Sequence, residues 1–145
     1  MKKILAIAAA VLALCSCINE DGIVIKLPDE IAKQWTSEVY DDDGEVSEIL
    51  LWDFVSNEGA VSFVYFDSLE SLKTFPQYRS YKDYIFDVQC RKKGDIYTIT
   101  ISDGDNSKYY FADVKGTTCT VTGEDGYQWH LTWCPVTVSA IPVDY

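Results

Sequence analysis

The chain has 145 residues and a formal net charge of −11, from 23 Asp and Glu residues against 12 Lys and Arg. This length is enough for one domain with a hydrophobic core and too short for two such domains. The acidic balance argues against nucleic acid as a partner, because nucleic-acid phosphates are bound by Lys and Arg.

The first seventeen residues resemble a bacterial lipoprotein signal. Lys2 and Lys3 precede an apolar run from Ile4 to Leu14, which is shorter than the roughly 20 residues that a membrane-spanning helix needs. The run ends in Leu14-Cys15-Ser16-Cys17, which resembles the lipobox of such signals, with Cys17 as the residue that accepts palmitate and other acyl chains. The alternative is an ordinary secretory signal that happens to contain a cysteine.

This interpretation divides the chain into three parts. Residues 1–16 are a signal peptide, residues 17–27 a lipid-anchored tether, and residues 28–145 the folded domain. Cleavage removes Lys2 and Lys3 and leaves a net charge of −13. Glu20 and Asp21 resemble the surface-export signal of Bacteroidetes lipoproteins. We therefore expect a protein of the bacterial cell envelope that is lipid-anchored to the outer membrane, on the cell surface rather than in the periplasm.

The domain is predicted to begin with a short helix and to continue as strands. Pro28–Gln34 is predicted to form one helical turn or two, because it has Pro28 near its start and two acidic residues in the first turn. The strands are predicted at Trp35–Tyr40, Val46–Val55, around Val61, Phe63 and Tyr65, from Tyr84 to Cys90, from Tyr97 to Ile101, and at Lys108–Val114, Thr118–Thr122 and Tyr127–Trp133, with a last stretch at Val136–Ile141.

Apolar and polar residues alternate along these segments, which is the period of a half-buried strand. The second strand, for example, places Leu50, Trp52 and Phe54 on one face. Most strands are joined by short turns rich in Asp, Asn and Gly, as in an antiparallel meander. The one long connection is 68–79. We therefore predict an all-β, up-and-down barrel of about eight strands. The alternative, a β-sandwich, usually needs a long crossing connection.

The short helix, Trp35 and the consecutive hairpins, behind a lipoprotein signal, resemble the lipocalin-like domains of Bacteroidetes lipoproteins. This resemblance covers most of residues 28–133. It implies an eight-stranded barrel with an internal ligand cavity, and it does not name the ligand.

Acidic residues gather at one end of such a barrel. In a meander, alternate turns share an end, and those at this end hold ten acidic residues, while the opposite end has Lys92, Lys93 and Lys115. We expect the acidic end, capped by residues of the long connection, to bind a small ligand, a cationic partner or a cation. The candidate residues are Asp41, Asp42, Asp43, Asp103, Asp105, Glu124, Asp125, Leu69, Leu72, Phe75 and Tyr78. The alternative is that these acids serve only turn geometry and solubility.

The sequence contains no catalytic motif, and we expect no enzyme, no cofactor and no metal site. Asp41–Gly44 and Asp103–Asn106 are rich in oxygen ligands but lack the spacing of an EF-hand. A nucleophilic dyad of His130 with Cys119 or Cys134 is conceivable, yet exported cysteines more often form disulfides. We favour a Cys119–Cys134 bond, although a three-residue loop would place the two on opposite faces.

The expected function is a membrane-anchored binding module for a small apolar or amphipathic ligand or for a partner. The alternative is an inhibitor or interaction protein that presents its acidic loop face to a basic protein. An empty cavity inside the barrel would support the first, and a filled barrel with an ordered acidic face the second. Aromatic residues, among them Tyr109, Tyr110, Trp129 and Trp133, could form a carbohydrate platform or line a ligand cavity, although most are more simply explained as core residues.

Overall fold

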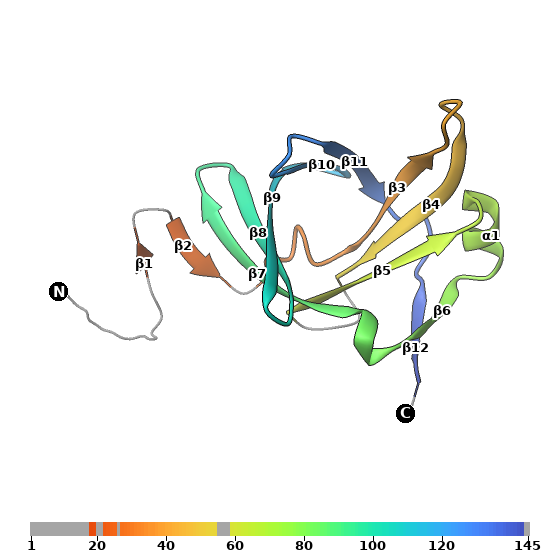
Figure 1. Cartoon of the computed structure of the whole chain (residues 1–145), viewed down its shortest axis with the longest axis horizontal. Coiled ribbons are helices and arrows are strands. Elements are labelled where there is room, and N and C mark those ends of the chain that lie inside the picture. Colours follow the sequence, from red (N-terminus) through yellow and green to blue (C-terminus); the bar gives the residue numbers. More distant parts are fainter. Residues whose placement is uncertain (1–17, 20–21, 26, 55–58, 144–145) are drawn as a thin grey trace.

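The computed structural model describes residues 18–19, 22–25, 27–54 and 59–143, so the predicted signal peptide and the predicted lipid acceptor Cys17 lie outside the described residues. The domain is a closed antiparallel barrel of eight strands (Figure 1). Each strand pairs with the next along the chain, and β11 returns to β3. The barrel strands are β3 (Gln34–Tyr40), β4 (Val46–Asp53), β5 (Ala60–Phe66), β7 (Ile85–Lys93), β8 (Ile96–Asp103), β9 (Asn106–Lys115), β10 (Thr118–Gly123) and β11 (Gln128–Trp133). The prediction of an up-and-down barrel is confirmed.

The remaining elements lie outside the barrel wall. They are β1 (Ile18–Asn19), β2 (Gly22–Ile25), α1 (Leu69–Thr74), β6 (Gln77–Ser80), the 3₁₀ helix η1 (Lys82–Tyr84) and β12 (Ser139–Pro142). No helix in the described part of the chain has the length and apolar content to span a bilayer.

The predicted N-terminal helix is a single turn. The Pro28 carbonyl accepts hydrogen bonds from the amides of both Ile31 and Ala32, but β3 already begins at Gln34, so no second turn can form. The turn closes one end of the barrel: Ile31 is buried, and its carbonyl accepts a 3.1 Å hydrogen bond from the Trp35 indole. Of the two predicted alternatives, one turn or two, the single turn is therefore the one that forms.

The barrel interior is filled by side chains. Leu50, Trp52 and Phe54 point inward as predicted and belong to one buried cluster with Trp35 and Leu131. The space left among these side chains is about 10 Å³, which barely holds one water molecule. The internal ligand cavity that the lipocalin resemblance implied is therefore absent from the described barrel.

A second layer covers the outer face of β4 and β5. Leu72 from α1 and Tyr78 from β6 are buried there against Ile49, Leu51 and Val138. The prediction that the 68–79 segment caps the acidic end is therefore wrong for Leu72 and Tyr78, which pack against the side of the barrel. The other two predicted caps, Leu69 and Phe75, are exposed. The reason is that the outward side chains of β4 are apolar and need a covering layer.

Polar side chains fasten this layer to the barrel. The Tyr78 hydroxyl donates to the buried Asp53 carboxylate at 2.7 Å. The Gln34 side-chain amide accepts from the Val138 amide at 2.8 Å and donates to the Val138 carbonyl at 2.7 Å. The Gln34 side chain thus makes the pair of hydrogen bonds that a neighbouring strand would make with the Val138 backbone. These bonds hold the C-terminal segment that leads to the β6–β12 pair.

The barrel wall separates at the end that carries the β3–β4, β8–β9 and β10–β11 turns, here called the mouth. Strand β5 pairs with β7 only over Ala60–Ser62, and β3 pairs with β11 only at Trp35 and Thr36. Beyond those points the two strands pair only with β4. The ribbon β3–β4–β5 therefore leans away from the other hairpins (Figure 1).

The segment predicted as a tether contains two short strands. Strands β1 and β2 pair with each other, and β2 continues the sheet by pairing with β7 at Cys90, Arg91 and Lys92. These positions lie beside the β7–β8 turn, at the end opposite the mouth. The N-terminal segment therefore joins the barrel at its lysine-bearing end.

Candidate functional site

Aromatic rings from several strands line the mouth. Trp52 on β4 contacts Phe63 on β5 with ring centroids 4.9 Å apart, and it contacts Trp129 on β11 at 5.9 Å. Tyr110 on β9 lies 5.8 Å from Trp129, and Phe86 on β7 lies 6.0 Å from Phe63. Such edge and tilted contacts are favourable between rings. They place Phe63, Phe86, Tyr110 and Trp129 around the opening, with the buried Trp52 in contact with two of them.

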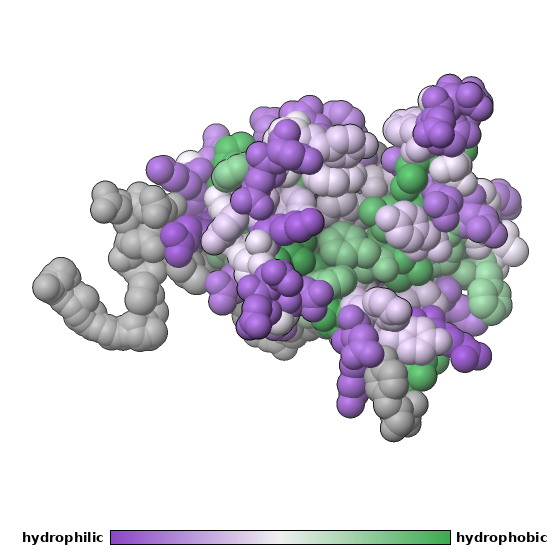
Figure 2. Space-filling view, in the orientation of Figure 1, coloured by the Kyte–Doolittle hydropathy of each residue, from purple (hydrophilic) through white to green (hydrophobic). Residues whose placement is uncertain are grey.

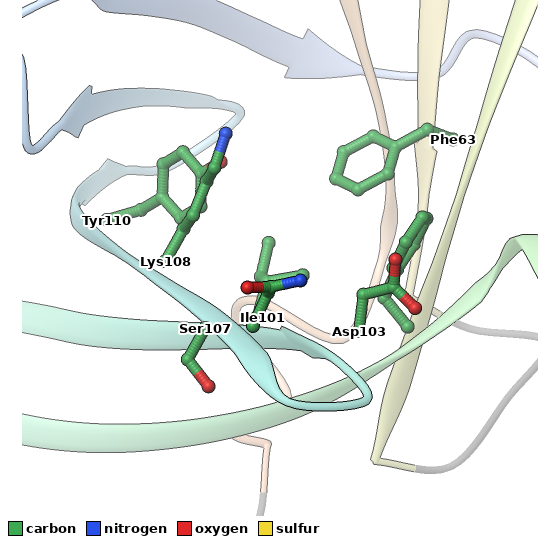
Figure 3. Close-up of a pocket in the computed structure, with 8 residues that line it drawn as sticks. Phe63, Ile101, Asp103, Ser107, Lys108 and Tyr110 are labelled. Carbon is green, nitrogen blue, oxygen red and sulfur yellow. The ribbon is translucent and has the colours of Figure 1, made fainter.

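An open pocket of about 490 Å³ lies where β5 separates from β7. Its apolar walls are Phe63, Phe86, Ile101 and Tyr110, and its polar residues are Asp103, Asn106, Ser107 and Lys108. Phe63 and Tyr110 project from opposite sides with Ile101 between them (Figure 3). Figure 2 shows apolar surface at the centre of this face, bordered by hydrophilic residues. A volume of this size is typical of small-molecule sites.

A second, smaller pocket of about 260 Å³ adjoins the first, because Lys108 and Tyr110 line both. Its other lining residues include Glu124, Asp125 and Trp129. Burial raises the pKa of Tyr110, and the nearby Glu124 and Asp125 add to this effect, so its hydroxyl stays neutral. The Trp129 ring lies over Gly123, where the Cβ of any larger residue would come within 3.3 Å of the ring.

The structure brings only some of the predicted acidic residues to these pockets. Asp103 lines the larger pocket, and Glu124 and Asp125 line the smaller one. Asp105 is exposed at the β8–β9 turn and lines neither. The run Asp41–Asp43 lines neither pocket; it lies on the β3–β4 hairpin, which projects away from the other hairpins (Figure 1).

Turn geometry accounts for two of the predicted acids. The Asp41 carboxylate accepts hydrogen bonds from the amides of Asp43 and Glu45, and the Asp125 carboxylate accepts one from the Tyr127 amide. Both are side-chain turns of the kind that favour aspartate. Asp41 is therefore a turn residue, while Asp125 holds its turn and also lines the smaller pocket.

Sequence reasoning did not identify Phe63, Phe86, Ile101, Ser107 or Lys108 as ligand contacts, although all five line the larger pocket. The first three are placed on inward faces by the period of two. Their proximity to a turn at the acidic end was the available signal for a mouth position. Lys108 stands two residues before Tyr110 on β9, so the same alternation puts both side chains on one face, but a charged residue gave no reason to expect that this face lines a pocket.

The three described cysteines are free, so the predicted Cys119–Cys134 disulfide is wrong. Cys119 is buried in the barrel interior with Cys90, whereas Cys134 packs in the outer layer. Their strands put them on opposite sides of the wall, as the loop length suggests. The dyad of Cys119 with His130 does not form either: His130 pairs with Thr120, the neighbour of Cys119, and is therefore on the other face.

We expect the interior cysteines to resist alkylation in the folded protein. Burial, with a smaller effect of Glu30, raises the pKa of Cys90 to about 12, and burial raises that of Cys119 to about 11. At pH 8 both remain protonated and unreactive. Iodoacetamide should modify neither residue by mass spectrometry until urea unfolds the barrel. Unfolding restores the ordinary pKa of the two thiols. Their contribution to the stability of the fold is therefore fully present below about pH 8.5 and is lost as the pH rises toward their pKa values in the folded protein. Rapid modification at pH 8 without urea would contradict this assignment.

Within the described ranges, no three His, Cys, Asp or Glu side chains come close enough together to hold a metal ion. No protein-family model, curated protein or solved structure matches the chain. The fold and the mouth geometry are therefore the basis for assigning a function.

Proposed function

We propose that this protein is a lipid-anchored binding module of the bacterial cell envelope and that it binds a small amphipathic ligand at the barrel mouth. The observation that carries this proposal is the contrast between the interior, with about 10 Å³ of free space, and the mouth pocket, with about 490 Å³. A ligand would place its apolar part against Phe63, Phe86 and Ile101 and keep its polar part at the rim.

The pairing of β2 with β7 supports an orientation on the membrane. A lipid on Cys17 would anchor the chain beside the end that carries Lys92 and Lys93, because β2 joins β7 at Cys90–Lys92. The mouth would then face away from the membrane and toward the medium on the cell surface. This arrangement leaves the pocket open to ligands from outside the cell envelope.

A second candidate function is an interaction protein that docks its mouth on a basic partner. The filled interior favours this candidate, and so do three exposed tyrosines on the strands and turns of the mouth. Their exposed fractions are 56% for Tyr40, 60% for Tyr65 and 56% for Tyr127. Tyrosine is enriched in protein interfaces, and acidic surfaces attract basic partners.

The neutral fluorescent probe N-phenyl-1-naphthylamine tests the proposed mouth site. We expect the full-length protein to bind it and Lys108→Trp to weaken binding about tenfold or more, which corresponds to about 1.4 kcal/mol. The reason is that the new indole would fill the pocket. Lys115→Trp is the matched control, since Lys115 is exposed at the opposite end of the same strand, β9, and lines neither pocket. Titration of probe fluorescence measures both. Equal affinities for the two variants, or no probe binding by the unaltered protein, would contradict the proposal.

A further inference from the structure

We propose that the ligand bound at the mouth carries an organic cation, such as an ammonium group, next to an apolar body. This inference rests on the proposed function and adds the chemical class of the ligand. Two independent kinds of group favour a positive charge there: carboxylates at the rim and aromatic rings in the walls.

The carboxylates outnumber the bases around the two pockets. Asp103, Glu124 and Asp125 line them, whereas Lys108 is their one basic lining residue among those described. The Asp103 carboxylate is exposed, and Glu124 has a single long hydrogen bond, from the Tyr109 amide at 3.3 Å. Both therefore keep oxygens available for a ligand. An anionic ligand would meet like charge on this rim.

The aromatic walls of the pockets also favour a positively charged ligand. The faces of Phe63, Phe86, Tyr110 and Trp129 carry negative potential, and a cation within about 6 Å of a ring centroid is attracted to it. The protein forms such contacts elsewhere: the Lys33 ammonium lies 4.9 Å from the Trp133 ring, and the Lys92 ammonium lies 5.4 Å from the Tyr97 ring. A ligand with an apolar body alone would contact the rings but would make no use of the carboxylates at the rim.

Lys108 competes with the proposed ligand. Its side chain lies alongside Tyr110 in the pocket (Figure 3), and it is exposed, so it can swing aside when a ligand cation enters. This arrangement predicts opposite effects for two kinds of substitution: removal of a rim carboxylate should weaken binding of a cation, and removal of the Lys108 charge should strengthen it.

Three soluble probes of similar size separate the contribution of charge: 2-phenylethylammonium, the neutral 2-phenylethanol and the anionic 3-phenylpropanoate. Each is titrated against the full chain with N-phenyl-1-naphthylamine as the reporter. We expect the ammonium to displace the reporter at roughly three- to tenfold lower concentration than the alcohol, and the carboxylate to be the weakest. The difference between ammonium and alcohol should shrink in 0.5 M salt, because the Debye length there lies between about 3 and 10 Å, and exposed charges farther apart than this are largely screened.

Isosteric variants assign the effect to named residues. Asp103→Asn and Glu124→Gln should each weaken ammonium binding about two- to fivefold, the size expected of exposed ion pairs, and should leave alcohol binding unchanged. Lys108→Gln should strengthen ammonium binding by a similar factor. Asp95→Asn removes the same charge at the β7–β8 turn, at the opposite end of the barrel, and should have no effect.

Three outcomes would overturn the inference. The first is equal binding of the alcohol and the ammonium, and the second is an effect of Asp95→Asn equal to that of Asp103→Asn. Either would leave the mouth as a site for neutral ligands, so the proposed function would stand but the ligand would not need a cation. Binding of an oligolysine peptide without binding of the small ammonium would assign the acidic rim to a protein partner. Failure of the protein to bind the neutral reporter at all would instead contradict the proposed function itself.

Discussion

Replacement of Trp35 by alanine is expected to lower the free energy of unfolding by about 3–5 kcal/mol, the usual cost of removing a fully buried tryptophan. Trp35 is 1% exposed and lies at the closed end of the barrel. Its indole N–H donates to the Ile31 carbonyl, so the substitution would also remove one of the two hydrogen bonds that this carbonyl accepts, the other coming from the Lys33 amide. A loss of this size is a large part of the total stability of a small domain.

Trp133→Ala is the matched control for Trp35→Ala. Trp133 contacts Trp35 edge-on with centroids 6.5 Å apart, but its side chain is 44% exposed, so we expect a loss of only about 1–2 kcal/mol. Urea unfolding followed by circular dichroism measures both. Similar losses for the two variants would show that Trp35 does not hold the closed end as the structure indicates.

The second large effect is expected in the outer layer, where Leu72→Ala should lower the free energy of unfolding by about 2–5 kcal/mol. Leu72 is completely buried between α1 and the outward side chains of β4, among them Leu51. Its removal would leave a cavity in the layer that holds α1, β6 and the C-terminal segment on the barrel.

Leu69→Ala is the matched control in the same helix. Leu69 is 42% exposed, so the same substitution should cost about 1 kcal/mol or less. Binding of the neutral reporter at the mouth should be unchanged in both variants, because α1 packs on the outer face of the sheet and the pocket opens on the inner face. Equal destabilisation by the two substitutions, or loss of reporter binding in folded Leu72→Ala, would contradict this separation.

The sequence alone determined the barrel, because the signals for it are local. Side chains alternate between the two faces of a strand, so Leu50, Trp52 and Phe54 had to share one face, and turns such as Asp103–Asn106 had to join neighbouring antiparallel strands. Successive hairpins with one face apolar then leave few arrangements other than a meander that closes on itself. The grouping of alternate turns at one end followed from the same local rules.

Only the tertiary structure decided where the open space lies and which residues surround it. Local patterns do not measure volume, so they could not show that side chains fill the interior while the early separation of β5 from β7 opens the mouth. The sequence also did not show that Leu72 and Tyr78 cover the barrel wall at Leu51. Leu51 belongs to a continuous apolar run, which does not show which side chains face outward, and the layer that covers it comes from segments distant in sequence. The meeting of Phe63, Asp103 and Lys108 has the same origin: strand separation and packing bring them together, and both depend on contacts between residues far apart in the chain.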